Sequence, residues 1–296
     1  METLLKKIGK KIRFYFRFLL WKIAGVFKKQ ITVSTKQGTF TVFCQDKEIS
    51  KDLFCHRDYD REFYFKVFKF LSARKSFKKG TLVDIGANIG VTAIGVINDK
   101  LIEKAIAIES EPENFSLLEK NIKANYLEKL IIPLLYAVSD MNGNLPLELS
   151  ENIFGDHRIR QTFKNNVADG PFNESRRKVI KVKAQTIDSI IDSLPKNFTR
   201  EISLIWSDVQ GYEGYVFKGG RQIFATGVPV VAEIWPYGIK RSGMSEKEFC
   251  RIAQNFWSSF WVLRQENFVK YPSSLLKNLF TELGEKGNYT NVIFTK

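Results

Sequence analysis

Apolar and polar residues follow different periods in different parts of the chain, and these periods predict its secondary structure. Around Gln37-Gly38 they alternate one by one, which predicts a β-hairpin, and residues 58–74 then show the spacing of a helix. From residue 80 onward, short apolar runs alternate with helical stretches, a pattern typical of a parallel sheet covered by helices on both faces. We therefore divide the chain into an N-terminal segment, an extension and an α/β domain, at residues 1–29, 30–79 and 80–296.

The α/β domain contains the clearest elements. Its strands are predicted at residues 81–85, 104–108, 131–136, 203–207, 228–234, 258–265 and 290–296. Its helices are predicted at residues 89–98, 113–125 and 213–225. Residues 150–178 follow neither period and contain Gly155, Gly170 and Pro171, so we expect a long loop there. Long loops inside compact domains usually serve a function.

The N-terminal segment combines the apolar spacing of a helix with a high positive charge. Residues 1–29 hold seven Lys and two Arg against one Glu, a large share of the net charge of +14. Apolar residues recur at helical spacing at Leu5, Ile8, Ile12, Phe16, Leu19 and Ile23. Because charged residues interrupt every apolar run, neither a membrane span of roughly 20 residues nor a signal peptide is predicted. A cationic amphipathic helix suits the surface of an anionic membrane, and the alternative is a solvated helix that packs on the rest of the protein.

The composition argues against disulfide and zinc sites and indicates a cellular compartment. Three scattered cysteines and two histidines form no disulfide framework, and Cys55 beside His56 lacks the spacing of a zinc site. Free thiols fit a reducing cytoplasm, so we expect a cytoplasmic protein that binds the inner face of the membrane peripherally. No RNA- or DNA-binding motif accompanies the positive charge, so a nucleic-acid partner is not expected. None of these features predicts the oligomeric state.

The stretch LVDIGANIGVTAIGVI, residues 82–97, predicts a buried strand that ends at a glycine turn and continues into a helix. Glycines at such a turn let a ligand approach the backbone, although they can also serve the turn geometry alone. A nicotinamide dinucleotide site would need glycine where this turn has Asn88. The spacing of Asp84, Gly86, Asn88 and Gly90 instead resembles the first motif of class I S-adenosylmethionine-dependent methyltransferases. That resemblance implies that the turn lies against the methionine part of the cofactor, whose ammonium Asp84 would hold.

The next two predicted strands also end in polar residues. Glu109 lies 23 residues after Gly86, where an acidic residue can accept both ribose hydroxyls, and the alternative is a solvated carboxylate. The following strand ends in Ser139 and Asp140, which in a class I methyltransferase would contact the adenine. Three strand ends would thus bind the three parts of S-adenosylmethionine.

Two further motifs, ISLIWSDVQGYEGYVFKGG and VPVVAEIWP, complete a family pattern. Together with the preceding motifs they resemble the FkbM-type methyltransferases over roughly residues 80–295. This resemblance implies a mostly parallel, seven-stranded class I methyltransferase sheet, and methyl transfer from S-adenosylmethionine, generally to oxygen. Asp208, Gly211 and Glu213 match the family pattern, whereas Gln210 replaces its usual glutamate.

Methyl transfer to an alcohol benefits from a group that takes the hydroxyl proton. Asp208 ends an apolar strand beside the expected sulfonium and is our first candidate, although the same residue would also suit the cap of the following helix. His157 in the long loop is a second candidate, with a surface residue as the alternative. Glu233, at the end of a strand, is a third, with a lysine ion pair as the alternative. The sequence leaves open whether these three residues hold a divalent metal.

The long loop is strongly basic, and its Arg158 and Arg160 would bind an anionic acceptor through paired hydrogen bonds. We assign Glu213 to the acceptor as well. We therefore expect an O-methyltransferase that acts on a hydroxyl of an anionic sugar, glycan precursor or related metabolite near the membrane. A nicotinamide-dependent oxidoreductase is one alternative, against which Asn88 argues. A non-catalytic membrane-associated protein of the same fold is another, which Gln210 would favour.

Overall fold

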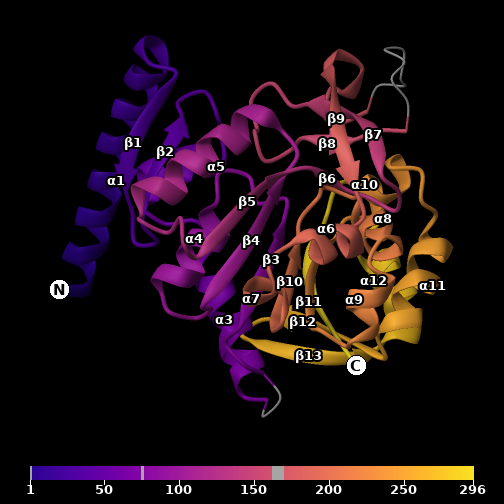
Figure 1. Cartoon of the computed structure of the whole chain (residues 1–296). Coiled ribbons are helices and arrows are strands. Elements are labelled where there is room, and N and C mark those ends of the chain that lie inside the picture. Colours follow the sequence, from indigo (N-terminus) through magenta and orange to yellow (C-terminus); the bar gives the residue numbers. More distant parts are fainter. Residues whose placement is uncertain (1, 75–76, 162–169) are drawn as a thin grey trace.

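The computed structural model describes residues 2–74, 77–161 and 170–296, which form a large sheet with helices on both faces (Figure 1). The sheet has eight strands in the order β13-β12-β14-β11-β10-β3-β4-β5. Their bounds are β3 Thr81–Ile85, β4 Lys104–Glu109, β5 Ile131–Leu135, β10 Ile202–Ser207, β11 Val230–Ile234, β12 Ser259–Arg264, β13 Asn267–Pro272 and β14 Thr290–Thr295. Strands β11, β10, β3, β4 and β5 are parallel to one another, and β14 pairs antiparallel with β11. This is the α/β architecture of class I methyltransferases that the sequence predicts.

The sheet has one strand more than the expected seven. Strand β13 pairs with β12 at the edge, where most of its side chains are exposed. An edge strand without a buried face carries little apolar periodicity, so the sequence contains no clear signal for it. The helix predicted at residues 213–225 is interrupted in a similar unpredicted way. It ends at Lys218 and a second helix begins at Arg221, and Gly219 between them has no room for a Cβ, which would lie 2.0 Å from the carbonyl oxygen of Ser139.

Apolar side chains alternate between the two faces of the sheet and form two cores. In β4, Ala105 and Ala107 pack in the core that includes helices α3 to α5, whereas Ile106 and Ile108 pack in the core that includes α8, α11 and α12. The helices of the domain are α4 Val91–Asn98, α5 Pro112–Ala124, α6 Ile187–Ser193, α7 Lys196–Thr199, α8 Glu213–Lys218, α9 Arg221–Ala225, α10 Pro236–Arg241, α11 Glu246–Phe256 and α12 Leu276–Leu283, with a 3-10 turn η2 at Ser273–Leu275.

A second, four-stranded sheet is inserted between β5 and α6. Its order is β6-β9-β7-β8, with bounds β6 Ala137–Val138, β7 Gly143–Leu149, β8 Arg158–Ile159 and β9 Lys178–Gln185. The long loop predicted at residues 150–178 contains β8 and a 3-10 turn, η1, at Glu174–Arg176. Its residues 162–169 lie outside the described residues.

The N-terminal parts form a helix, a hairpin and two further helices beside the domain, and the first helix and the hairpin lie at the left of Figure 1. They are α1 Glu2–Phe27, β1 Gln30–Ser34, β2 Thr39–Phe43, α2 Ile49–His56 and α3 Arg61–Ser72. The hairpin and α3 confirm the predicted elements, whereas α2 was not predicted. Helix α1 packs on α2 through Trp21 against Phe54, with ring centroids 5.3 Å apart, and through Phe14 against His56, at 4.8 Å.

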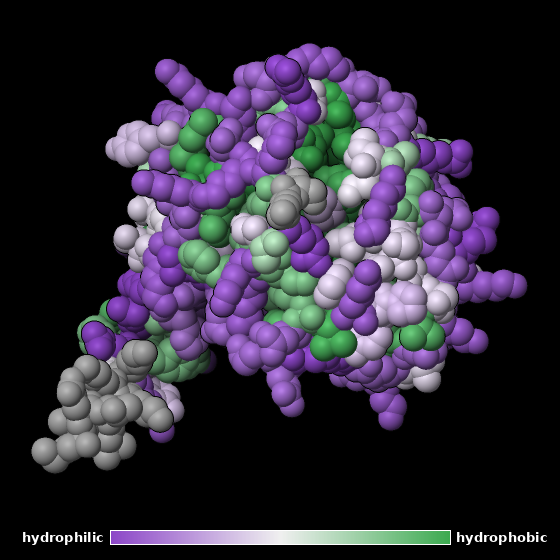
Figure 2. Space-filling view, turned by 90° about the horizontal axis from the view of Figure 1, so that it is seen from below, coloured by the Kyte–Doolittle hydropathy of each residue, from purple (hydrophilic) through white to green (hydrophobic). Residues whose placement is uncertain are grey.

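Seen from below, hydrophilic residues cover much of the surface, with hydrophobic patches between them (Figure 2). Across the residues that the structure describes, no helix combines the length and the apolar character needed to cross a membrane.

Candidate active site

Four carboxylates lie at or just beyond the carboxyl ends of adjacent parallel strands. They belong to Asp84 in β3, Glu109 in β4, Asp208 after β10 and Glu233 in β11. The carboxyl ends of parallel strands meet at one edge of a sheet, which is where α/β proteins bind ligands. Two neighbouring cavities lie at this edge, and both are lined by Ile49, Gly155, Asp208 and Gln210.

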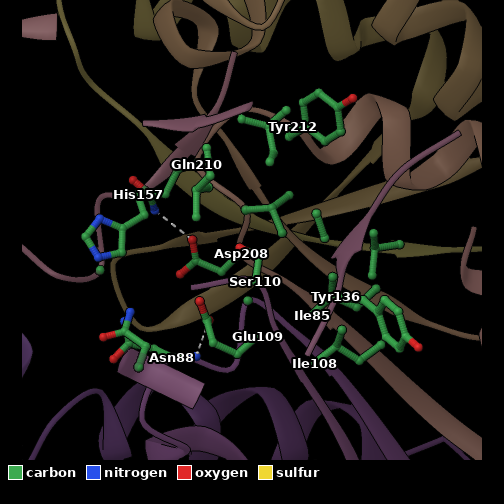
Figure 3. A pocket seen from close by; sticks show the side chains of 18 of the residues that line it. Ile85, Asn88, Ile108, Glu109, Ser110, Tyr136, His157, Asp208, Gln210 and Tyr212 are labelled. Atoms are coloured by element: carbon green, nitrogen blue, oxygen red, sulfur yellow. Dashed lines mark hydrogen bonds between the residues drawn. The ribbon is translucent and has the colours of Figure 1, made fainter. Parts of the chain in front are cut away.

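The first cavity lies along the ends of β3, β4 and β5 (Figure 3). Its wall includes the glycine turn, Glu109 and residues 136–138, and residues of the predicted long loop also border it. In Figure 3, Glu109 and Asp208 lie at its centre, with Asn88 and His157 on one side and Tyr136 on the other.

Two backbone N–H groups hold the Glu109 carboxylate in this cavity. Asn88 N donates to Oε2 at 2.9 Å, and Glu111 N donates to Oε1 at 2.8 Å. Burial raises the pKa of Glu109 to about 7, although these hydrogen bonds oppose the rise. Each carboxylate oxygen retains acceptor capacity for a ligand. Glu109 is therefore fixed in orientation and still able to accept hydrogen bonds.

The N–H groups at the tip of the glycine turn already have partners within the protein. Asn88 N donates to Glu109, and Ile89 N donates to Asn88 Oδ1 at 2.8 Å. Gly86, with φ of 85°, is required by the protein itself, because a Cβ there would lie 1.9 Å from the carbonyl oxygen of Asp208. Pyrophosphate binding needs free N–H groups at the start of the helix. A turn whose N–H groups are engaged beside a carboxylate does not suit a dinucleotide.

Asp84 and Gly90 lie behind the glycine turn and do not line the first cavity. Asp84 is 2% exposed, and its Oδ2 has no hydrogen-bond partner among the described residues. Burial and the neighbouring Asp208 carboxylate raise the pKa of Asp84 to about 7. Gly90, with φ of 89°, immediately precedes α4.

Ser139 and Asp140, the predicted adenine contacts, also lie outside the lining of the first cavity. The Ser139 hydroxyl is buried 3.1 Å from the Tyr212 hydroxyl, and Asp140 forms an ion pair of 3.1 Å with Lys218. The preceding residues of the same strand end, at positions 136–138, line the cavity in their place. Ser139 and Asp140 therefore lie just beyond the part of this strand end that lines the cavity, and their contact with adenine stays a prediction.

Asp208 lies where the two cavities meet. Gln210 Nε2 is 2.8 Å from Asp208 Oδ1 and 3.5 Å from Glu233 Oε2, so one amide group faces both carboxylates. Burial raises the pKa of Asp208, the charges of other carboxylates add to the rise, and the hydrogen bond from Gln210 opposes it. Helix α8 is capped at Tyr212, so Asp208 is not its cap. Where the family pattern would add another carboxylate, Gln210 supplies a hydrogen-bond donor.

Glu213, predicted to bind the acceptor, is fully buried beneath the loop that carries Asp208 and lines neither cavity. Its Oε1 accepts a hydrogen bond of 2.9 Å from Val209 N, and burial raises the pKa of its carboxyl to about 8. The side chain supports the loop from within, because burial keeps it from direct contact with an acceptor.

His157 lines the first cavity, but its nitrogens are poorly disposed to take a proton. Its Nδ1 accepts a hydrogen bond of 3.0 Å from Ser150 N, which leaves the ring proton of the neutral imidazole on Nε2. Burial, with the charge of Arg177 as a smaller contribution, lowers the pKa of His157 to about 4. Asp156 adjoins His157 in sequence but bonds to Arg158 and Arg177. The geometry therefore disfavours His157 as the base.

Arg158 and Arg160 are buried and paired with carboxylates. Arg158 Nε lies 2.5 Å from Asp156 Oδ1, and its Nη1 lies 3.2 Å from Glu174 Oε1. Arg160 Nε lies 3.0 Å from Glu148 Oε2. The two guanidinium groups that predicted an anionic acceptor thus already have anionic partners within the protein. Their positive charge no longer supports that prediction.

The second cavity has a volume of about 190 Å³ and combines carboxylates with aromatic rings. The carboxylates without an ion pair among the described residues belong to Glu48, Asp60, Asp208 and Glu233. The aromatic rings belong to Tyr59, Phe172, Trp235 and Tyr289.

Several residues of the second cavity carry no local sequence signal for a site. Glu48 and Asp60 directly precede α2 and α3, and Asn291 lies in β14. Asn291 pairs with Glu233 because β14 runs antiparallel to β11 and so begins at the edge where β11 ends. Assigning β14 as this antiparallel neighbour would have identified Asn291, whereas the positions of Glu48 and Asp60 depend on tertiary packing.

Asp208, His157 and Glu233 were the candidate ligands for a divalent metal in this region. Within residues 2–74, 77–161 and 170–296, no group of three or more His, Cys, Asp or Glu side chains is arranged to hold a metal ion.

The chain is similar to known proteins in sequence and in structure. The family model described as "Methyltransferase FkbM domain" matches residues 84–251. No curated protein sequence matches the chain. Among solved structures, an FkbM methyltransferase from Methylobacillus flagellatus is 16% identical with a TM-score of 0.42, over 84% of this chain and 55% of that one. The tRNA m1G37 methyltransferase of M. jannaschii is 12% identical with a TM-score of 0.41, over 90% of this chain and 56% of that one.

This chain spans only about half the length of each of these two proteins. The family match, by contrast, covers more than half of this chain and includes the glycine turn, Glu109 and Asp208. S-adenosylmethionine is the usual cofactor of such methyltransferases. The chain belongs to the FkbM methyltransferase family.

Proposed function

We propose that this protein transfers the methyl group of S-adenosylmethionine to a hydroxyl of a sugar, glycan precursor or related metabolite. The observation that carries the proposal is the Glu109 carboxylate, which is fixed by Asn88 N and Glu111 N and retains acceptor capacity in the first cavity. The ribose of the cofactor offers two hydroxyl donors that match this capacity. The nicotinamide alternative lacks such support because the N–H groups of Asn88 and Ile89, at the tip of the turn, already have acceptors within the protein.

The first cavity suits the remaining parts of the cofactor as well. Residues 136–138 form an apolar wall for the adenine, next to Glu109. The unpartnered Oδ2 of Asp84 lies behind the glycine turn and outside the cavity lining, so Asp84 would hold the ammonium of the methionine part through a bridging water. When bound, S-adenosylmethionine supplies a methyl group on a sulfonium, and an acceptor oxygen takes this methyl group as the carbon–sulfur bond breaks.

Asp208 is the proposed base. It borders both cavities, so it lies between the site assigned to the cofactor and the site assigned to the acceptor. A carboxylate whose pKa is raised by burial accepts a proton more readily than a solvated one. The hydrogen bond from Gln210 fixes its orientation. Asp208 would take the hydroxyl proton as the oxygen–methyl bond forms.

We further propose that α1 binds an anionic membrane surface. The residues of α1 that lie opposite its packed side are between 47% and 81% exposed: Ile12, Phe16, Leu19, Ile23, Val26 and Phe27. At about 100° per residue, Arg13 and Arg17 flank one side of this stripe, and Lys11 and Lys22 flank the other. An exposed apolar stripe between two rows of cations is the arrangement expected of a helix that lies in a membrane interface.

The direct test of the function uses S-adenosylmethionine with a labelled methyl group. The full chain is incubated with fractions of a glycan-precursor extract, and products are separated and analysed for the methylated atom. We expect a labelled methyl ether in one fraction, which disappears when the fraction is omitted. Binding of S-adenosylmethionine without labelled product from any fraction would contradict the proposed transfer and favour a non-catalytic role.

A further inference from the structure

The second cavity is lined by several carboxyl groups that have no cationic partner among the described residues. Asp208 also borders the first cavity, where the sulfonium would lie, but Glu48, Asp60 and Glu233 line the second cavity only. Glu233 is 5% exposed, and Gln210 Nε2, at 3.5 Å, is its hydrogen-bond partner among the described side chains. Burial raises the pKa of Glu233 well above its ordinary value, and a cationic ligand beside it would favour its ionised form.

Arg158 is the cationic residue among the described residues that line the second cavity, and its guanidinium already pairs with carboxylates. Arg158 is held by Asp156 and Glu174, and its guanidinium lies 4.6 Å from the ring centroid of Phe172 and 4.4 Å from that of Trp235. Its charge is therefore shared with its own carboxylates. An anionic acceptor would meet more negative than positive charge in the cavity.

A second observation points to a ligand in the same place. Trp235 is 4% exposed, and its indole Nε1 has no hydrogen-bond partner among the residues that the structure describes. The same holds for Nη2 of Arg158. Both residues line the second cavity, so each contributes a buried donor without a described partner to its wall. Buried polar groups normally find partners, and here a ligand with hydroxyl or ring oxygens would provide them.

We propose that the acceptor is a hydroxylated ring that carries a protonated amine, of the amino-sugar or amino-cyclitol class. The inference rests on the proposed function and specifies its acceptor. The ammonium binds among Glu48, Asp60 and Glu233, the ring packs on the aromatic wall, and its oxygens accept from Trp235 and Arg158. The ammonium keeps its protons and is no nucleophile. The hydroxyl oxygen forms the new bond to the methyl carbon, its proton goes to Asp208, and the sulfur leaves as a neutral thioether.

The test compares two halves of one extract with labelled S-adenosylmethionine. One half is treated with acetic anhydride under conditions that acetylate amines and spare hydroxyls, which removes the positive charge and keeps the ring. We expect labelled product from the untreated half, retained on a cation exchanger and bearing the methyl group on oxygen, and at least a tenfold loss of label after acetylation. Undiminished label after acetylation, an anionic product or a methyl group on nitrogen would overturn the inference.

The outcomes distinguish a failure of the amine assignment from a failure of the proposed methyltransferase function. If a labelled methyl ether still forms after acetylation, the proposed methyltransferase function stands, and the inference that the acceptor carries an amine is refuted. The absence of any product, with S-adenosylmethionine bound, refutes both.

Single substitutions in the second cavity then identify the residues that bind the amine of the acceptor. Once the acceptor is purified, Glu48→Gln and Asp60→Asn should each raise its KM about tenfold with little change in kcat, because each removes one charged hydrogen-bond partner. They should also reduce the preference for the amine over its acetylated form. Glu119→Gln, an exposed position on α5, is the matched control and should change neither value. An unchanged preference in both variants would place the amine elsewhere and contradict the assignment.

Discussion

The two cavities share Asp208 and Gln210, yet they are built in different ways. The first lies along the ends of β3, β4 and β5 and is also bordered by the long loop, and backbone N–H groups hold its central carboxylate, Glu109. The second consists of side chains that come from segments far apart in the sequence, such as Glu48 before α2 and Asn291 in β14. Under the proposed function, the strand ends of the core fold would provide the cofactor site, and the added segments would contribute to the acceptor site.

The added segments also connect the acceptor cavity to the N-terminal helix. Helix α1 packs on α2, and Ile49 at the start of α2 lines both cavities. If α1 binds a membrane, the acceptor cavity lies near that surface. The extension would then select the acceptor both by its side chains and by its location.

The largest effect is expected at the residue that the two cavities share. Asp208→Asn removes the proposed base and preserves the size of the side chain, so turnover should fall at least tenfold, and up to about 10⁴-fold, with unchanged cofactor affinity. Initial rates with labelled S-adenosylmethionine provide the measurement.

His157→Ala is the comparison for this substitution, because it removes a neutral ring that lines only the first cavity. Its turnover should stay within about threefold of the parent protein, an estimate based on the absence of a proton-transfer role. Near-normal turnover of Asp208→Asn, with a large loss in His157→Ala, would reverse the assignment of the base.

The second effect concerns α1 and the surface it would bind. In the full chain, Phe16→Ser combined with Leu19→Ser should weaken binding to anionic vesicles at least tenfold, because each buried apolar side chain contributes about 1.5–3 kcal/mol. Sedimentation with phosphatidylserine-containing vesicles measures this, and binding should also fall with salt. Met141→Ser, at another exposed apolar position, is the control. Equal binding by both variants, or binding independent of lipid charge, would contradict the proposal.

A smaller effect is expected beneath the loop that carries Asp208. Burial raises the pKa of Glu213 from its ordinary 4.5 to about 8, so the folded state binds a proton that the unfolded state releases between these values. The free energy of unfolding should therefore fall as pH rises from about 5 to 8. Glu213→Gln keeps the acceptor for Val209 N and should make this fall about 1 kcal/mol or more smaller. Denaturant titrations at both pH values test this, with Glu119→Gln as control; an unchanged slope would contradict the burial effect.

The way each cavity is built also explains which of its residues could be predicted from the sequence. The ends of the parallel strands follow from apolar runs, so Glu109 and Asp208 were identified from the sequence together with the fold. The glycine turn was recognised, but the sequence did not show that Gly86 faces the carbonyl oxygen of Asp208. Arg158 resembled an anion-binding residue because its partner Glu174 lies 16 residues away and is brought to it only by folding.

The central claim, that the first cavity holds the cofactor and the second the acceptor, is tested most directly by calorimetric titration with S-adenosylhomocysteine. We expect binding to the parent protein, affinity lower by about 1.5–3 kcal/mol in Glu109→Ala, and unchanged affinity in Asp60→Asn, whose side chain lines only the second cavity. A nicotinamide dinucleotide should show no binding. Unchanged affinity in a folded Glu109→Ala protein, or tight binding of the dinucleotide in place of S-adenosylhomocysteine, would contradict the account.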